Sequence, residues 1–263
     1  AAVASGISEA LITTATGLIV WSRGSDGLTI IGDGLTADNR DLGLEAGFRL
    51  RLPGTDEPGR IDVQATATNV DLATTSRYLP VGIMSPKVVG WLDTAIVSGR
   101  VPEARLELAG PTKGFPYPGG EGVFEVSFAA QDLALDYARD WPSATDISAD
   151  ILFRGPGLFA DIRKGRLGGA VVDDLRLEIP VLREGMLSIR GTAQGPLEAV
   201  KSYVLESPLR AVIGEAMSNT RIYKGDTDIG VDILLPLNDL AGRDVLVELG
   251  IDDARLEYGG VTH

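Results

Sequence analysis

Hydrophobic and polar residues alternate at every second position through much of this chain. A period of two is typical of a β-strand that has one apolar and one polar face. The clearest segments are "FRLRL" at 48–52, "IDVQATA" at 61–67, "VFEVSFA" at 123–129, "ISADILF" at 147–153, "MLSIRG" at 186–191, "DIGVDILL" at 228–235 and "VLVELGI" at 245–251. The pattern predicts a mainly β protein whose strands each have one apolar face.

Short glycine-rich segments separate these strands. Examples are "GSDG" at 24–27, "GDG" at 32–34 and "YPGG" at 117–120, and the chain has 33 glycines in all. Glycine supplies the positive φ that tight hairpin turns need. Because the connections are short, we expect neighbouring strands to be antiparallel.

Two regions have a helical period instead. Ser85 is a candidate N-cap, Pro86 occupies the first helical position, and Gly99 is the expected stop. Between them, apolar residues recur at spacings of three and four, which predicts an amphipathic helix over 85–98. A second helical pattern runs from Leu197 and restarts after Ser207. We therefore expect helical elements near 72–79, 85–98 and 197–217, placed as caps on a sheet and not as crossovers between parallel strands.

Charge limits the partners of this chain. Its 263 residues have a formal net charge of -13 and a pI near 4.5. A nucleic-acid backbone needs clustered cations on the protein, so we expect no nucleic-acid partner. An anionic bilayer surface would also repel the chain, and no run of 18 or more apolar residues is present to cross a membrane.

Neither the two ends of the sequence nor its cysteine content indicates a reactive or metal-binding site. Without cysteine there is no disulfide, thiolate nucleophile or sulfur-ligated metal. The single histidine, His263, is the last residue, so no site is built on it. The sequence starts at Ala1 without a signal-peptide pattern, and we expect it to be an internal fragment of a longer chain.

Two motifs suggest enzymatic chemistry but are better explained otherwise. The segment "GPGLFA" at 155–160 fits a loose dinucleotide pattern, yet the alternation that follows is that of a strand, which favours a hairpin turn. The acidic residues Asp132, Asp136 and Asp140, and the doublets 173–174 and 252–253, lie on the polar face or in turns. Solvated charge is the favoured interpretation, with acid–base catalysis or a calcium site as the alternative. We expect no enzyme activity, metal or cofactor.

Aromatic residues cluster with prolines in "RYLP" at 77–80, "GFPYP" at 114–118 and "DWP" at 140–142. Proline removes a donor from a sheet ladder, so these clusters mark strand ends or sheet edges. Edge protection by Tyr78, Phe115, Tyr117 and Trp141 is the favoured interpretation. The alternative is an aromatic rim that contacts carbohydrate or lipid.

Taken in order, several segments resemble the YhdP-like proteins of the AsmA-like superfamily, large envelope proteins of Gram-negative bacteria related to TamB. The resemblance is dense over 77–157, where "RYLP", a helix ending in "SGR", "GFPYP", "EGVF", "LDY", "DWP" and "FRGPG" follow one another. It is looser over 158–240, where "SPL" at 207–209 and "LPL" at 235–237 are the anchors. Before residue 77 it depends mainly on strand rhythm.

The resemblance implies an elongated, curved antiparallel sheet, the β-taco, whose apolar groove carries phospholipid acyl chains between the inner and outer membranes. It implies a periplasmic location within an inner-membrane-anchored parent protein. We then expect lipid contacts at apolar positions that alternation places on one face of three successive strands: Phe124, Val126, Phe128, Leu133, Leu135, Ile147, Ile151 and Phe153.

Alternatives remain open for both the fold and the helix over 85–98. Alternation also fits a closed β-sandwich that serves as a structural or partner-binding module, or a carbohydrate-active jelly roll that uses Asp132 to Asp140. The apolar stripe of the helix is ordinary core packing in one interpretation and a movable lid over acyl chains in the other. The stripe is formed by Val88, Trp91, Leu92 and Ile96.

Overall fold

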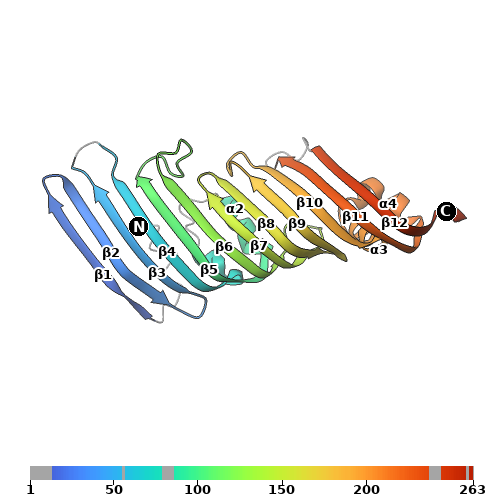
Figure 1. The fold of residues 1–263 in the computed structure, drawn as a ribbon, viewed down its shortest axis with the longest axis horizontal. Helices are drawn as coiled ribbons and strands as arrows, with labels where there is room; N and C mark the ends of the chain where they lie inside the picture. Colours follow the sequence, from blue (N-terminus) through green and yellow to red (C-terminus); the bar gives the residue numbers. More distant parts are fainter. Residues whose placement is uncertain (1–13, 55–56, 79–85, 237–243, 259–260, 263) are drawn as a thin grey trace.

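The computed structural model describes residues 14–54, 57–78, 86–236, 244–258 and 261–262, and these residues form one antiparallel sheet (Figure 1). Its 13 strands are hydrogen-bonded in chain order, from β1 at one end to β13 at the other. The strands are β1 Thr14–Gly24, β2 Gly27–Asp38, β3 Gly43–Leu52, β4 Arg60–Asp71, β5 Ile96–Pro111, β6 Val123–Leu135, β7 Ala144–Arg154, β8 Gly157–Leu167, β9 Ala170–Ile179, β10 Met186–Pro196, β11 Thr220–Pro236, β12 Asp244–Tyr258 and β13 Val261–Thr262.

This strand order confirms the elongated antiparallel sheet and rules out the closed alternatives. In a sandwich or jelly roll, the strands divide between two sheets that pack face to face. Here every described strand belongs to a single sheet, and β1 does not pair with the last strands. The β-sandwich and jelly-roll alternatives were therefore wrong, because alternation defines an apolar face but does not define what covers it.

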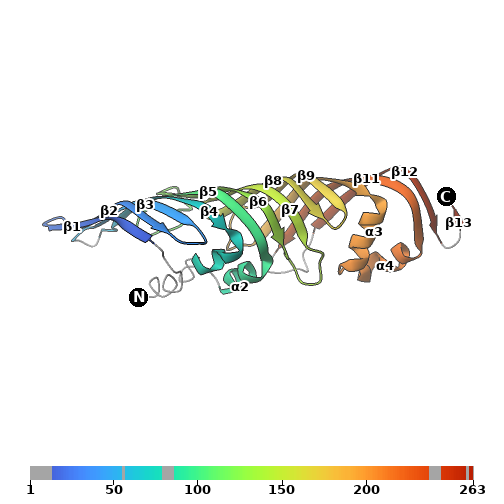
Figure 2. The same cartoon turned by 90° about the horizontal axis from the view of Figure 1, so that it is seen from below.

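Helical segments lie on one side of the sheet, and the strands bend toward that side (Figure 2). They are the 3-10 helix η2 Leu72–Tyr78, α2 Pro86–Ala95, α3 Leu197–Glu206 and α4 Arg210–Ser218. η2 and α2 connect β4 to β5, and α3 and α4 connect β10 to β11. Both connections lie at the same end of the strands, together with the β2–β3, β6–β7 and β8–β9 connections. We call this end the helix-side rim and the opposite end the free rim.

The helix expected over 85–98 is shorter in the structure, which describes it from Pro86; Ser85 lies outside the described residues. It ends at Ala95, and Ile96 already belongs to β5, where it pairs with Leu135. The carbonyl of Ala95 accepts a hydrogen bond from the backbone N–H of Asp136 at 2.8 Å. Sheet pairing thus begins before the helical pattern of the sequence ends, as favoured by the β-branched residues that follow Ala95.

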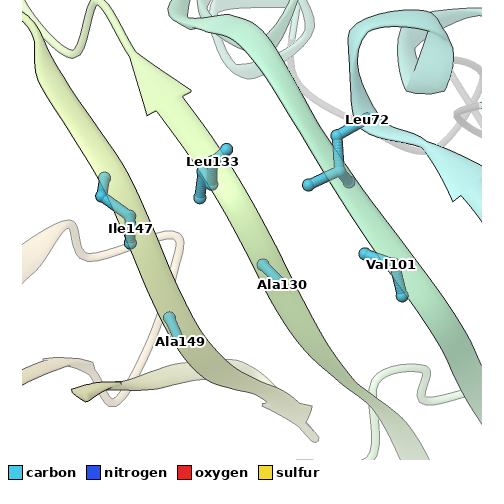
Figure 3. Close-up of a cluster of buried hydrophobic side chains, with 6 residues drawn as sticks. All are labelled: Leu72, Val101, Ala130, Leu133, Ile147 and Ala149. Carbon is cyan, nitrogen blue, oxygen red and sulfur yellow. The ribbon is translucent and has the colours of Figure 1, made fainter. Parts of the chain in front are cut away.

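A buried apolar cluster fixes η2 against the sheet near the helix-side rim (Figure 3). Leu72 of η2 packs there with residues of three strands, and each member is at most 7% exposed. Arg77, also in η2, forms an ion pair at 3.1 Å with Asp41, a buried carboxylate in the β2–β3 connection. We call this set the core cluster: Leu72, Val101, Ala130, Leu133, Ile147 and Ala149.

The two faces of the sheet differ in polarity. On the face away from the helices, charges of opposite sign stand on neighbouring strands. Glu125 pairs with Arg154 at 3.0 Å, and Arg176 pairs with Asp161 at 2.8 Å, in both cases between residues directly opposite in the strand register. Such cross-strand pairs suit a face that stays in water. We call it the outer face.

Candidate functional site

The helix side of the sheet presents rows of apolar side chains that cross many strands. Directly opposed residues in an antiparallel sheet share a face, so the strand register identifies these rows. One row consists of Leu44, Ala67, Ala104, Phe128, Ile151, Ala160, Leu177, Ile189 and Ile233. A second row consists of Ala46, Ala65, Leu106, Val126, Phe153, Leu158 and Ile179. We call these rows, with their same-face neighbours, the apolar face.

The apolar face has a covered half and an open half. Toward the helix-side rim, Leu133 and Ile147 are buried together with Leu72 of η2, and Val172 on β9 and Ala193 on β10 are buried as well. Toward the free rim, the large residues from Phe124 to Phe128 on β6 remain half-buried. The sheet and its helices therefore leave part of this apolar surface without cover from the described residues.

Each of the eight predicted lipid contacts lies on this face, although Leu133 and Leu135 do so for another reason than the predicted alternation. Strict alternation would put Phe128 and Leu133 on opposite faces, because one has an even number and the other an odd one. A β-bulge at Asp132, whose φ is 50°, inserts one residue between Ala130 and Leu133 and returns the side chains to the same face. The expected three strands are also two, because 123–135 is one continuous strand.

The eight residues have different surroundings. Leu133 and Ile147 belong to the core cluster, and Leu135 packs against it. Phe124 and Val126 lie in the open half, as do Phe128, Ile151 and Phe153, although Phe128 and Ile151 also touch the edge of the core cluster. Of the eight, Leu133 and Ile147 are buried, while the other six keep partly exposed apolar surface.

The residues of the expected lid also differ in burial and in the element to which they belong. Trp91 of α2 is 46% exposed, Leu92 is half-buried, and Ile96 is not in the helix but packs on the core cluster from β5. Val88 lies in α2, but its side chain is outside the described part of the structure. The indole N–H of Trp91 donates a hydrogen bond to the carbonyl of Tyr137 at 3.0 Å, which ties α2 to the β6–β7 connection.

Aromatic contacts continue this connection to α3. The hydroxyl groups of Tyr137 and Tyr203 are 2.9 Å apart, and the ring of Trp141 lies 6.3 Å from Tyr137 and 5.8 Å from Tyr203 between ring centroids. Burial raises the pKa of both phenols, and the hydrogen bond between them raises the pKa of Tyr203 further. Trp141 therefore bridges the β6–β7 connection and α3, instead of only protecting an edge. Tyr78 has no described side chain.

The acidic residues considered for catalysis lie in water, as the favoured interpretation held, apart from the doublet at 252–253, whose side chains are outside the described part of the structure. Asp132 is 71% exposed and pairs with Arg100 at 2.6 Å, while Asp136 accepts a hydrogen bond from Ser143. Asp140 and the doublet at 173–174 are exposed as well. Among the residues described, no group of three or more His, Cys, Asp or Glu side chains is arranged to hold a metal.

The dinucleotide-like motif is a hairpin turn, as expected. Gly155 has a φ of 51° and lies in the turn between β7 and β8. β8 follows immediately as a strand and not as a helix. A pyrophosphate site of this type needs a helix N-terminus after the glycines, so this feature of the dinucleotide fold is missing.

Sequence reasoning missed how far the apolar face extends. Leu106 on β5, Leu158 on β8 and Leu177 on β9 continue the rows on both sides of β6 and β7. Alternation within each segment showed which residues share a face of that strand. It gave no strand register, which is what joins the segments into one surface.

The fold and site define a protein with a long open sheet, one face of which is apolar and partly uncovered. The model of the YhdP protein family matches residues 4–262, and the chain belongs to this family. It is 28% identical over 220 residues to the Intermembrane phospholipid transporter YhdP of Escherichia coli (strain K12), a match that covers 84% of this chain and 17% of that protein. The chain thus spans about a sixth of the length of this relative. No solved structure matches it significantly.

Membrane-spanning helices were sought in the described segments. None of the helices there has the length and hydrophobicity needed to cross a bilayer.

Proposed function

We propose that this chain binds phospholipid acyl chains on its apolar face and conducts them, as part of a longer protein, between the inner and outer membranes of a Gram-negative envelope. The observation that carries the proposal is the open half of the apolar face. Removing apolar surface from water is favourable, and each acyl CH₂ that is buried contributes about 0.8 kcal/mol. A protein that leaves rows of large apolar side chains half-exposed has a ready surface for such chains.

The relative supports the choice of cargo, because it is described as an intermembrane phospholipid transporter. Passage along an apolar face requires no bond to be made or broken, so we propose a carrier and not an enzyme. We further propose a periplasmic location, with contact to both membranes made by other parts of the parent chain. The curvature of the sheet toward the helix side would make the apolar face the inside of a groove.

Adjacent positions on β6 provide the test. Phe128 lies on the apolar face, and Ser127 lies on the outer face opposite Arg105 and Leu152. Both side chains are half-buried, so they differ mainly in the face they occupy. A photo-crosslinking amino acid is placed at each position in the full-length parent protein in cells, and the adducts are analysed by mass spectrometry.

We expect phospholipid adducts at Phe128 and none at Ser127. Equal labelling at both positions would indicate unspecific contact with membranes and contradict the proposal. An absence of adducts at Phe128, with normal amounts of folded protein, would also contradict it.

A further inference from the structure

The β5–β6 loop, residues 112–122, is a firmly packed structure at the free rim. Tyr117 in this loop is 5% exposed, and its hydroxyl donates to the carbonyl of Pro111 at 2.9 Å. Its ring lies between two glycines: a Cβ at Gly110 would come within 2.7 Å of the ring, and one at Gly122 within 2.8 Å. Real Cβ atoms are not found at such distances, so glycine is required at both positions. The loop is thereby fixed to the end of β5 and the start of β6.

This fixed loop holds Phe115 over the end of the apolar face. The ring of Phe115 packs edge-on against Phe124 with a centroid distance of 4.9 Å and an interplanar angle of 63°. Phe115 nevertheless remains 44% exposed. Edge protection accounts for the buried Tyr117, but it does not account for a large apolar ring that is held half-exposed beside the open half.

The open half is long enough to hold one acyl chain along the strand. From Phe124 to Ala130, six steps along β6 at about 3.3 Å each give about 20 Å. The hydrocarbon region of one bilayer leaflet is about 15 Å thick. At Ala130 the core cluster begins and the face is covered. A chain that lies along the strand with its methyl end near the core cluster would therefore have its polar end near Phe115.

Charge at the free rim fits the polar end of a phospholipid. Lys113 is exposed in the same loop and forms no ion pair with any residue that the structure describes. Beside the same strands at the helix-side rim, Arg77 of η2 pairs with Asp41 and Arg100 of β5 pairs with Asp132. Farther along that rim, Arg210 of α4 is also exposed, without an ion pair among the described residues. A lysine acts on a phosphate as a point charge, and one without a carboxylate partner is free to do so.

We propose that the bound phospholipid is oriented with its phosphate beside Lys113 and the upper part of its acyl chain against Phe115, while its methyl end points to the core cluster. This inference rests on the proposed function and specifies how the cargo lies on the apolar face. The free rim is then the side at which the polar headgroup meets water. At the helix-side rim, α2 and α3 are linked through the aromatic residues of the β6–β7 connection.

Orientation can be measured with two phosphatidylcholine probes. One carries a diazirine near the carboxyl end of an acyl chain, and the other carries it at the methyl end. Each is photolysed with the full-length parent protein, and the labelled peptides are mapped by mass spectrometry. We expect the carboxyl-end probe to label 112–122 and the methyl-end probe to label β6 near Phe128 and Ala130.

The outcomes separate this inference from the proposed function. Reversed labelling, or carboxyl-end labelling at the helix-side rim, would overturn the orientation while leaving phospholipid binding intact. If neither probe labels the apolar face, the proposed function fails as well.

Phe115 has a matched control in Val123. The two side chains have nearly equal exposure, 44% and 45%, and both lie at the free rim. Val123 precedes Phe124 on β6 and therefore points to the outer face. We expect Phe115→Ala and Lys113→Gln to lower the amount of phospholipid that copurifies with the parent protein several-fold, and Val123→Ala to leave it unchanged. Unchanged phospholipid in both Phe115→Ala and Lys113→Gln would overturn the proposal, and thermal unfolding would verify that each variant is folded.

Discussion

Phe128 and Leu133 share the apolar face but have different surroundings. Leu133 is 6% exposed inside the core cluster, while Phe128 is half-buried at the boundary with the open half. A carboxylate at a buried apolar position has neither water nor a partner, which costs several kcal/mol. We expect Leu133→Asp to lower the free energy of unfolding by about 3–5 kcal/mol, and Phe128→Asp to lower it by no more than about 2 kcal/mol.

Denaturant unfolding of the two variants measures this difference. Phe128→Asp should also lose bound phospholipid, because a hydrated charge on the open half excludes acyl chains. If Phe128→Asp destabilises the fold as much as Leu133→Asp does, then the face is sealed in solution and the open half does not exist.

The phenols of Tyr137 and Tyr203 link stability to alkaline pH. Burial raises the pKa of both groups above the ordinary value of 10.0. Above that pH the unfolded chain loses these protons while the folded chain retains them, so the free energy of unfolding must fall as pH rises. Below it, both states are protonated and the two groups cause no pH dependence.

We therefore expect the double variant Tyr137→Phe/Tyr203→Phe to show a shallower loss of stability above about pH 10 than the parent chain. Urea unfolding over a series of alkaline pH values measures the slopes. Equal slopes in the two proteins would show that neither phenol has a raised pKa. Two phenols that are exposed to water in the folded chain would give such equal slopes.

At the scale of elements, α2 is the helix whose mobility bears on the lid hypothesis. Of its side chains that the structure describes, Ala95 is buried and Trp91 is 46% exposed. Its link to the β6–β7 connection is the hydrogen bond from the Trp91 indole. We expect α2 amides to exchange at a lower free energy than those of β6, because little apolar burial opposes local opening.

Hydrogen exchange of the parent chain and of Trp91→Ala tests this expectation. The substitution should speed exchange in α2 and leave the core of β6 unchanged. Protection of α2 at the global limit would show that the helix is a fixed part of the core. The lid hypothesis would then be wrong.

At the scale of the molecule, the single open sheet requires an extended shape. A compact globular chain of this length has a radius of gyration of about 18 Å. Strands that follow one another in order across 13 positions spread the mass along one axis, as Figure 1 shows. We expect small-angle scattering from the monomer to give a clearly larger radius of gyration and an asymmetric distance distribution. A value near 18 Å would contradict the open sheet.

The sequence by itself determined the strand content, the antiparallel arrangement and the apolar character of one face. These are local properties: side chains alternate along a strand with a period of two, and short glycine turns permit only neighbouring antiparallel pairs. The predicted contacts on β7, from Ile147 to Phe153, shared a face for this reason.

Only the tertiary structure decided what meets that face. The bulge at Asp132 determines on which side Leu133 lies, and sheet pairing ends α2 at Ala95 although the helical pattern continues to Ile96. The position of η2 divides the face into a covered and an open half. Phe115 gained its place beside the open half because the Tyr117 ring fixes its loop. The bulge, the end of α2 and the position of η2 depend on contacts between residues distant in sequence, while the loop of Phe115 depends on packing of the Tyr117 ring between Gly110 and Gly122. The alternation of a single segment carries no information about either kind of contact.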